Sequence, residues 1–536
     1  MGLSFNNKHL TIMRKQIFFL FIISISLLFV GCKKSEVTTA SVQINDNQYV
    51  GIGTTDEPFG KILVSVSENK AKVNSVEIVL NGTSVLSDIE SIKLYSTATD
   101  TMFNTASATL LGEVAAPQAD TVVIKTKKSL PIGENNLWIT CNVSDKTKEG
   151  NTISAMPISI TLDKVCHELE NVDCARDVLL AYNVVFELNQ DGSKYYRIPA
   201  LTTAPDGSLV ALCDKRGDVL TDLPNTISIV ARRSIDGGKS WSPAVYVARG
   251  DTLTGKKYGD AAVITDKIEN KIVAIFVGDK GLWDSTTEEP QRLYVSESYD
   301  CGLTWSEPRD ITKEVYDGVY GRRAWQGMFA GSGHALQLEN GRLMFVVAAR
   351  HTAEMYGSLH NYAIYSDDHG KTWKASLNSP TPTPKNRGDE AKVVELMNGD
   401  ILMSIRNPHK GFRKFAISKN KGETWQPAHV HETLIDPACN GDIIRYNYGG
   451  RNYLIQSLPG SDTDRKDVTI YLSDDEGKSW NISRKLVDTM SAYSTLTVLP
   501  DGTIGCIVEV GKHVTPTDVG MRMIYYNFTL DWVLNK

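Results

Sequence analysis

Arginine, tyrosine and glutamate occur together in four short motifs of this chain, and these residue types suit chemistry on an anion. The motifs are Tyr196-Arg197-Ile198-Pro199, Glu390-Ala-Lys-Val-Val-Glu395-Leu, Ser404-Ile-Arg406-Asn407 and Tyr493-Ser-Thr-Leu-Thr-Val-Leu-Pro-Asp-Gly. A guanidinium group binds a carboxylate bidentately and stays charged at neutral pH. A phenol acts as a nucleophile when a neighbouring base takes its proton. Any one of these residues alone is best interpreted as a loop or core residue, so a site can be inferred only from their joint order.

The composition limits which partners such a site can serve. The 536 residues carry a formal net charge of −6, which argues against a general binder of nucleic acids or anionic membranes. An anionic substrate must therefore be held by a local group of arginines. The ten histidines show no HExxH or comparable spacing, so we expect neither a catalytic metal nor another cofactor.

Five copies of one octad, Ser-x-Asp/Asn-x-Gly-x-Thr/Ser-Trp, punctuate the second part of the chain. They begin at Ser234, Ser298, Ser366, Ser418 and Ser473, so the intervals between them are 64, 68, 52 and 55 residues. We expect each octad to be a turn in which Asp or Asn caps backbone N–H groups, glycine adopts a positive φ and tryptophan fills the base. Repeats of this size predict about six four-stranded units. The fold predicted for residues 166–536 is an all-β, six-bladed β-propeller.

Residues 41–165 are predicted to form a small β-sandwich that precedes the propeller. β-branched segments such as Lys61-Ile-Leu-Val-Ser-Val and Thr121-Val-Val-Ile-Lys alternate with turns there, and no catalytic constellation is visible. This domain either binds carbohydrate or braces the propeller. Just after it, Cys166 and Cys174 are close enough in sequence to form a disulfide in an exported protein.

The first 32 residues predict an export signal. Met13-Arg14-Lys15 precedes an apolar run that ends at Val30 and is too short for a typical membrane-spanning helix. The end of this segment, Leu28-Phe29-Val30-Gly31-Cys32, resembles a bacterial lipobox with Cys32 as the lipidated residue, followed by a tether over residues 33–40. We expect an exported lipoprotein, periplasmic or at the cell surface, that is held at the membrane only by its lipid. The alternative is simple secretion.

The octads and the four motifs, in this order, resemble those of bacterial and animal sialidases (neuraminidases) with Asp-box, or BNR, repeats. The resemblance covers essentially all of residues 180–530, and the lipobox suggests the lipoprotein form of Bacteroides-type members. It implies a retaining exo-α-sialidase, a glycoside hydrolase that removes terminal sialic acid from glycoproteins, glycolipids and oligosaccharides. The implied partner is a sialylated glycan, with no nucleic acid.

This resemblance also implies which residues hold and attack the substrate. Arg197, Arg406 and Arg465 would bind the carboxylate of sialic acid, and Tyr493 would be the nucleophile. A carboxylate nucleophile would be repelled by the carboxylate on the anomeric carbon, which explains the use of a neutral phenol. Because a free phenol has a pKa of about 10, Tyr493 needs a base and a positive environment.

The base and the acid each have an alternative. Glu390 matches the family's base, and Glu395 is the second choice on the same strand. The acid/base residue is expected in a loop soon after Arg216, where Asp222 and Asp218 compete. The spacing in the family favours Asp222.

Three further residues complete the implied site. Arg216 and Asp260 resemble residues that line the pocket for the N-acetyl and hydroxyl groups of the sugar. Glu509 resembles the carboxylate that pairs with Arg197 and orients it. The implied site residues come from separate blades, and a propeller gathers such positions at its axis.

Three other functions compete with the hydrolase. A sialic-acid-binding propeller without catalysis would need a lesion at Tyr493, Glu390 or Asp222, and none is visible. A trans-sialidase would use the same residues. A structural adhesin would not need the arginine triad.

Overall fold

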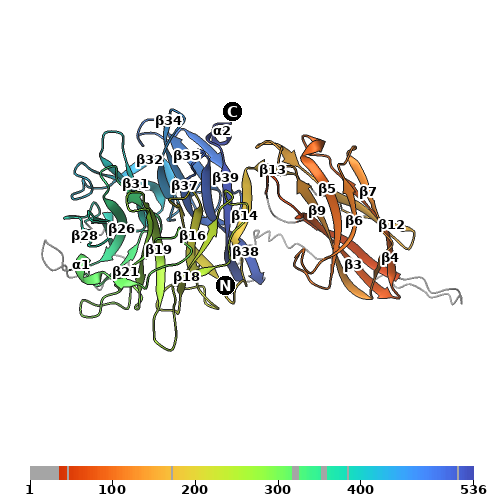
Figure 1. Ribbon diagram of the computed structural model, residues 1–536, viewed down its shortest axis with the longest axis horizontal. Helices are drawn as coiled ribbons and strands as arrows, with labels where there is room; N and C mark the ends of the chain where they lie inside the picture. The colour runs from red at the N-terminus through yellow and green to blue at the C-terminus, as the bar shows by residue number, and fades with distance from the viewer. Residues whose placement is uncertain are drawn as a thin grey trace, which may run out of the picture.

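The computed structural model of the chain describes residues 36–44, 48–170, 173–316, 325–351, 359–382, 386–515 and 518–535. Strands dominate these ranges, which also contain two short α-helices, α1 (Thr312–Tyr316) and α2 (Leu530–Val533). The all-β prediction is therefore confirmed. Figure 1 shows two β-rich domains side by side, the N-terminal one on the right. The predicted signal peptide, with Cys32, lies outside the described residues.

The N-terminal domain consists mainly of two facing sheets. The first has the order β1 (Glu36–Ile44), β3 (Glu57–Glu68), β9 (Gly133–Val143), β5 (Ile89–Ala98) and β6 (Thr109–Ala115). The second has the order β12 (Val165–Glu168), β11 (Met156–Leu162), β4 (Ala71–Val79) and β7 (Thr121–Lys125), with β8 (Ser129–Leu130) also on β4. A third, small sheet joins β10 (Thr152–Ile153), β13 (Arg176–Leu179) and β2 (Tyr49–Gly51).

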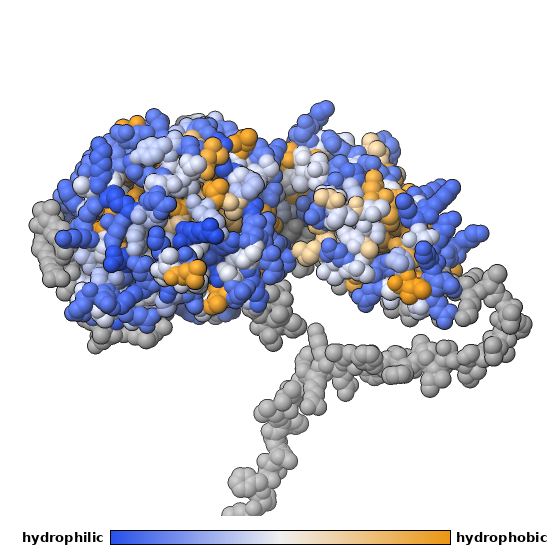
Figure 2. All heavy atoms as spheres, turned by 60° about the horizontal axis from the view of Figure 1, so that its bottom comes forward, coloured by the Kyte–Doolittle hydropathy of each residue, from blue (hydrophilic) through white to orange (hydrophobic). Residues whose placement is uncertain are grey.

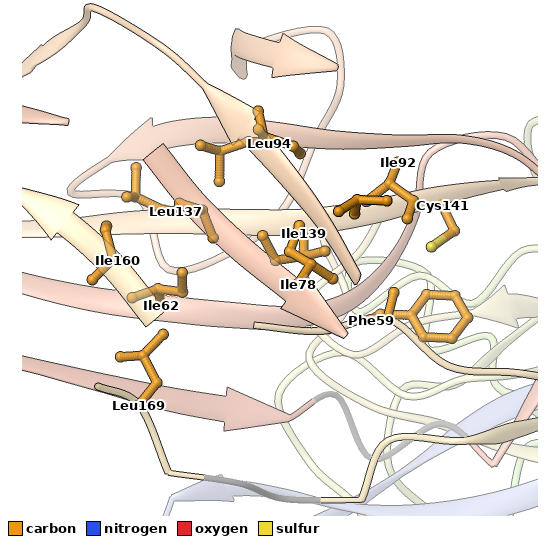
Figure 3. Close-up of a cluster of buried hydrophobic side chains, with 14 of the residues drawn as sticks. Phe59, Ile62, Ile78, Ile92, Leu94, Leu137, Ile139, Cys141, Ile160 and Leu169 are labelled. Atoms are coloured by element: carbon orange, nitrogen blue, oxygen red, sulfur yellow. The ribbon is translucent and has the colours of Figure 1, made fainter. Parts of the chain in front are cut away.

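The two facing sheets bury one apolar core. On β3, Ile62, Val64 and Val66 are buried while the residues between them are partly exposed, the alternation expected of a strand with one covered face. In Figure 3, Ile139 and Ile62 from one sheet lie beside Ile78 and Ile160 from the other. Each fully buried aliphatic side chain contributes about 1.5–3 kcal/mol. The core makes these sheets the expected β-sandwich.

The boundary between the domains falls later than residues 165/166, where we expected it. β12 pairs with β11, and β13 pairs with β10 and β2, so both strands still belong to the N-terminal domain. The first strand of the second domain is β14 (Ala181–Phe186), which pairs with the last strand of the chain. No change in composition marks this crossing, because strands of the same character stand on both sides of it.

The expected disulfide between Cys166 and Cys174 does not form. Both cysteines are free thiols; Cys166 is exposed on β12, and Cys174 is buried beside Ser154. Closeness in sequence is therefore not enough to bring the two sulfur atoms together.

Six sheets follow one another in the described part of the second domain. The first sheet consists of β15 (Tyr196–Thr203), β16 (Leu209–Lys215), β17 (Ser228–Ser234) and β18 (Val245–Ala248), and the second of β19 (Tyr258–Asp266), β20 (Lys271–Gly278), β21 (Arg292–Ser298) and β22 (Arg309–Asp310), with β24 (Gly333–His334) on β19. The third consists of β23 (Gly327–Ala330), β26 (Leu343–Arg350), β27 (Leu359–Ser366) and β28 (Lys374–Ala375), with β25 (Leu336–Gln337) on β26, and the fourth of β29 (Ala391–Glu395), β30 (Ile401–Ile405), β31 (Gly411–Ser418) and β32 (His429–Asp436). The fifth consists of β33 (Asp442–Tyr448), β34 (Arg451–Pro459), β35 (Val468–Ser473) and β36 (Ile482–Lys485), and the sixth of β37 (Ser491–Val498), β38 (Ile504–Thr515), β39 (Asp518–Phe528) and β14.

These sheets contact one another in a closed ring. β15 contacts β19, β19 contacts β23, β26 contacts β29 and β29 contacts β33. β33 contacts β37, and β37 returns to β15. The sixth sheet combines β14 from the start of the domain with β37–β39 from its end, so the ring is closed by backbone pairing. The expected propeller is present, and each sheet is one blade.

Each octad joins the third strand of a blade to its outermost strand. In the first, Ser240 N donates to Asp236 Oδ1 at 3.0 Å, Gly238 N donates to Ser234 Oγ at 2.8 Å, and Gly238 has φ +93°. The cap and the glycine therefore act as predicted. The sixth blade has no octad because its outermost strand, β14, comes from the other end of the domain.

The N-terminal domain packs against this sixth blade. The ring of Tyr49 on β2 lies 5.8 Å from that of Tyr526 on β39 and 6.3 Å from that of Trp532 on α2. Glu149 Oε1 accepts a hydrogen bond from Thr529 N at 3.0 Å. The domain therefore braces the blade that closes the ring.

Figure 2 shows a mostly hydrophilic surface with small, scattered hydrophobic areas on both domains. Within the described ranges, no helix combines the length and the apolar content needed to cross a bilayer.

The first octad provides a test of the glycine requirement. A Cβ on Gly238 would lie 1.9 Å from Tyr525 Cε1, whereas a Cβ on Gly237, which also has a positive φ, would meet nothing within 4 Å. We expect Gly238→Ala to lower the free energy of unfolding by about 2–4 kcal/mol and Gly237→Ala by about 1 kcal/mol. Denaturant unfolding of the two full-length variants measures the difference. Equal midpoints would contradict the packing of Tyr525 against this turn.

Candidate active site

The residues singled out by the motifs lie at one mouth of the ring. In an antiparallel blade, the innermost strand begins at the edge where the second strand ends. The site residues follow this rule: Arg197, Asp260 and Tyr493 lie in the first residues of β15, β19 and β37, Glu390 directly precedes β29, and Arg216 and Arg406 directly follow β16 and β30. Six segments from four blades therefore deliver their side chains to one place.

A cavity of about 450 Å³ opens at this mouth. Six charged side chains stand in its wall together with Tyr493: Asp222, Asp260, Arg387, Asp389, Glu390 and Arg406. The rest of the wall includes apolar side chains, among them Ile198, Leu282, Trp283, Phe329 and Leu359. A few convergent polar groups on an apolar wall are typical of a site for a small molecule.

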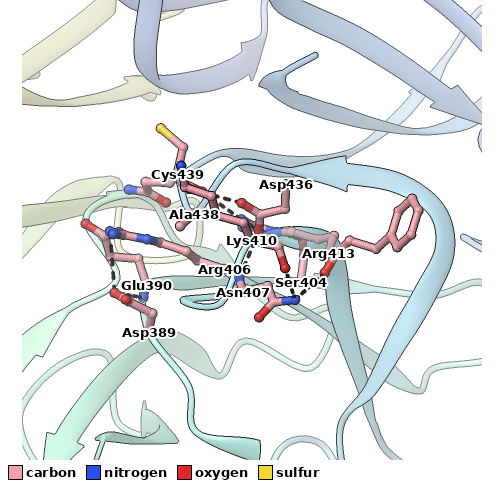
Figure 4. A network of polar contacts seen from close by, with 12 residues as sticks. Asp389, Glu390, Ser404, Arg406, Asn407, Lys410, Arg413, Asp436, Ala438 and Cys439 are labelled. Carbon is pink, nitrogen blue, oxygen red and sulfur yellow. Dashed lines mark hydrogen bonds and ion pairs between the residues drawn. The ribbon is translucent and has the colours of Figure 1, made fainter. Parts of the chain in front are cut away.

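Tyr493, Glu390 and Arg406 form the centre of this cavity. Arg406 Nη1 donates to Glu390 Oε2 and also to Tyr493 Oη, the latter at 3.2 Å. Arg406 also lies 3.5 Å from Asp389 Oδ1, and Figure 4 shows its guanidinium reaching towards this pair of acids. One cation thus contacts both a carboxylate and a phenol.

The pKa shifts at this centre have opposite signs. Burial alone would raise the pKa of Glu390, but the charge of Arg406 and the hydrogen bond with Tyr493 outweigh it, so the pKa is lowered. The pKa of Tyr493 is raised, first by burial and then by the charge of Glu390, while the neighbouring arginines oppose the rise. At neutral pH, a neutral phenol therefore stands beside an ionised carboxylate that can accept its proton.

Two more arginines lie against the ring of Tyr493. The Cζ atoms of Arg197 and Arg465 are 5.2 Å and 5.6 Å from its centroid. Neither residue is part of the cavity wall defined above, whereas Arg406 is. Arg465 donates to Ala438 O at 2.9 Å and, among the described residues, has no carboxylate within 4 Å. Three guanidinium groups therefore surround one phenol in a chain of negative net charge.

Glu509 on β38 holds Arg197 in place. Its two carboxylate oxygens accept from Arg197 Nε at 2.7 Å and Nη2 at 3.0 Å. They also accept from the backbone N–H groups of Ile198 at 2.7 Å and Tyr493 at 3.3 Å. Ile198 has φ +64° at a register shift between Arg197 and Ala200, so the carboxylate also stabilises an unfavourable backbone conformation.

A second acidic and basic cluster lies on the first two blades. Buried Arg216 contacts Asp214 Oδ2 at 2.9 Å and Asp222 Oδ1 at 2.7 Å. Asp214 Oδ1 also accepts from Asp260 N at 3.1 Å. Burial, followed by the charges of Asp214 and Asp222, raises the pKa of Asp260 well above its ordinary value. The side chain of Asp222 is 74 % exposed, so it reaches the cavity from a solvent-facing loop.

The two alternative residues lie elsewhere. Asp218 is exposed and is not part of the cavity wall. Glu395 is at the far end of β29, where it forms an ion pair with Lys421 at 2.6 Å and accepts from Glu339 N. Glu390 and Asp222 are therefore the members of each pair that the structure brings to the site.

Three charged residues of the site were not predicted from the sequence, and two of them, Arg387 and Asp389, stand in the cavity wall. Asp389 contacts Arg406, and Asp214 contacts Arg216, so each supports an arginine that was itself predicted. Asp389 directly precedes Glu390, and Asp214 stands two residues before Arg216. This closeness to a predicted residue was the only feature of the sequence that pointed to either aspartate. In the described part of the chain, no cluster of three or more histidine, cysteine or acidic side chains could hold a metal ion.

The ring of sheets is a β-propeller, and its mouth gathers a phenol, carboxylates and arginines around one cavity. Residues 224–506 match the family described as "BNR repeat-like domain", and residues 38–165 match the "N-terminal domain of BNR-repeat neuraminidase". The chain belongs to the BNR-repeat sialidase family.

Individual relatives agree with this assignment. The chain is 34 % identical to a sialidase of Micromonospora viridifaciens over 64 % of its own length, but spans only 53 % of that protein. It is 28 % identical to a sialidase of Bacteroides fragilis, over 84 % of this chain and 89 % of the relative. Among solved structures, the Hadza microbial sialidase Hz136 has the same fold, with a TM-score of 0.65, 22 % identity and coverage of 92 % of this chain and 99 % of that one.

The Arg197–Glu509 pair can be tested through stability. Glu509→Gln leaves the guanidinium of Arg197 without its buried countercharge, so we expect the free energy of unfolding to fall by about 3–5 kcal/mol. The control is Glu289→Gln, which removes one partner of the exposed Lys280–Glu289 pair and should not move the unfolding midpoint measurably. Equal effects of the two substitutions in denaturant unfolding would contradict the role given to Glu509.

Proposed function

We propose that the chain is a retaining exo-α-sialidase that hydrolyses terminal sialic acid from glycoproteins, glycolipids and oligosaccharides. The observation that carries the proposal is the contact of Arg406 with both Glu390 and Tyr493, with two more arginines on the phenol ring. A phenol paired with a carboxylate and surrounded by cations suits attack beside a substrate carboxylate.

Substrate binding is assigned to the three arginines. Each charge-assisted hydrogen bond to the sialic acid carboxylate would contribute about 1.5–3 kcal/mol. Arg465 suits this role because a backbone carbonyl, not an acid, is its partner in the free protein. Arg216 and Asp260 would contact the N-acetyl and hydroxyl groups of the sugar.

The first half of the reaction forms a bond between Tyr493 Oη and the anomeric carbon. As the phenolic oxygen attacks, Glu390 takes its proton, and Asp222 in its acid form gives a proton to the departing glycosidic oxygen. The bond between the anomeric carbon and the glycosidic oxygen breaks. A neutral phenol avoids the repulsion that a carboxylate nucleophile would meet.

The second half releases the sugar. Water attacks the anomeric carbon while Asp222 takes one of its protons, and the bond to Tyr493 Oη breaks as Glu390 returns the phenolic proton. Two displacements at one carbon give net retention of configuration. All groups regain their starting protonation states.

We also propose that the mature protein is anchored through lipidated Cys32 after export. The support is the basic flank, the apolar run and the lipobox-like end of the N-terminal segment.

The activity is tested by following an α-linked aryl sialoside by ¹H NMR with the full chain. We expect free sialic acid to appear first as the α anomer, and Tyr493→Phe to lower the rate by about 10³-fold or more. An anhydro sugar or a transfer product in place of free sialic acid would favour a trans-sialidase. Binding without turnover would favour a lectin, and wild-type rates in Tyr493→Phe would exclude this nucleophile.

The acid is tested with paired substitutions and two leaving groups. Asp222→Asn should lower kcat/KM on an alkyl sialoside by about 10²-fold or more, because its poor leaving group needs a proton. The loss on a 4-nitrophenyl sialoside, whose leaving group departs unprotonated, should be much smaller. Asp218→Asn serves as the matched control and should leave both rates within about twofold of wild type. The reverse pattern would assign the acid to Asp218.

A further inference from the structure

A lysine is buried in the protein interior two residues after Glu390. Lys392 on β29 is 1 % exposed, and the alternation of a strand places it on the same face as Glu390. Its Nζ donates to Asn440 Oδ1 at 2.9 Å, its one hydrogen bond among the described residues. Asn440 in turn donates to the carbonyl and hydroxyl oxygens of Ser332, at 3.0 Å and 3.2 Å. This ammonium therefore has a neutral amide as its direct partner.

The charged groups around Lys392 are engaged elsewhere. Asp442 on β33 accepts from Leu496 N at 2.7 Å and Ile443 N at 2.8 Å. Arg413 on β31 is paired with Asp436 at 3.1 Å. Among the described residues, no carboxylate lies within 4 Å of Lys392 Nζ, so its charge is balanced at longer range by Asp442 and Glu390.

The remaining titratable group of this region is His334 on β24. Its Nδ1 lies 4.0 Å from Asp442 Oδ1, and burial lowers its pKa, so it is neutral near pH 7. The adjacent Gly333 makes room for the lysine, because a Cβ there would lie 3.0 Å from Lys392 Cε. The charged groups that face Glu390 itself are Arg406, Asp389, Lys392, Arg465 and Asp260; the Tyr493 phenol is hydrogen-bonded to it, and the thiol of Cys439 also lies near.

Burying an ammonium without a direct countercharge is costly, and an uncharged chain of similar length would fill the same space. Burial lowers the pKa of Lys392 to about 8, while Asp442 and Glu390 oppose the fall, so it is still mainly charged at neutral pH. Its charge is among the influences that lower the pKa of Glu390. An uncharged side chain at position 392 would satisfy the packing, whereas the pKa of Glu390 depends on the positive charge of Lys392.

We propose that Lys392 is a positioning residue for Glu390, whose buried charge keeps that carboxylate ionised beside Tyr493 into the acidic pH range. The consequence for the reaction rests on the proposed role of Glu390 as the base. When the pH falls, a protonated Glu390 could not take the phenolic proton, so the lysine extends activity to lower pH.

The test compares full-length wild type, Lys392→Met and Lys392→Gln. Removing the positive charge raises the pKa of Glu390, so the acid limb of kcat/KM should move up by roughly one pH unit. Turnover at acidic pH should fall about tenfold relative to turnover at pH 7. Lys392→Gln retains a donor for Asn440 and serves if the methionine variant does not fold.

A second readout does not depend on activity. The infrared carboxylate band that titrates in wild type and is lost in Glu390→Gln reports Glu390 directly, and its midpoint should rise in both Lys392 variants. Lys271→Met is the control. This buried lysine on β20 forms an ion pair with Glu297 and lies at the end of the β19–β20 pair that is away from Asp260 and the site. It should leave the midpoint unchanged even if stability falls.

The outcomes separate the two claims. A raised midpoint in the Lys392 variants but not in Lys271→Met supports the inference, even if wild type turns over no sialoside, in which case the proposed function alone fails. An unchanged midpoint overturns the inference, whatever happens to thermal stability or to kcat.

Discussion

The buried pair of Arg197 and Glu509 is the contact on which the rest of the site depends. The two residues are 312 positions apart and join the first blade to the last. The same carboxylate accepts the backbone N–H groups at Ile198 and Tyr493, so one group places an arginine and the phenol that faces it. Because this carboxylate is fully buried, the ring must close before the site exists.

Closure of the ring and assembly of the site are therefore linked. β14 pairs with β39, and the N-terminal domain packs its aromatic residues on the same blade. The blade that carries Tyr493 and Glu509 is held by strands from both ends of the propeller. Such an arrangement keeps a phenol, a carboxylate and three guanidinium groups at constant separation, which is what preorganised electrostatic catalysis requires.

The acids around the site explain how a chain of negative net charge can bury several arginines at one mouth of the ring. Arg197, Arg216 and Arg406 each contact a buried carboxylate, which makes their own burial tolerable. Arg465 is paired with a carbonyl instead, and Lys392 with an amide. These two positive charges, which have no direct acidic partner among the described residues, stand near Tyr493 and Glu390.

Local sequence determined the repeat and its turns, and with them the all-β class and the expectation of about six blades. Asp236 and Gly238 act within their own octad, so eight residues suffice to predict that turn. The motifs also identified the residues that meet at the mouth, because strand alternation and blade order are regular. The possible Cys166–Cys174 disulfide is absent, because closeness in sequence does not fix the surroundings of either thiol. The predicted N-terminal domain, residues 41–165, agrees with the family match over residues 38–165, and the strands extend it: β12 forms a hairpin with β11, and β13 pairs with β2, far back in the chain.

Only the tertiary structure decided which acid meets which base. Glu390 and Glu395 belong to one motif, yet five residues of extended chain carry Glu395 away from the cavity to Lys421. Asp389 contacts Arg406 from the next strand, whereas Asp214 contacts Arg216 just beyond the end of its own strand. Lys392 lacks a direct acidic partner because Asp442 accepts hydrogen bonds from backbone N–H groups instead. Residue types and spacing are properties of the sequence, whereas charge balance depends on distances that exist only when the ring is closed.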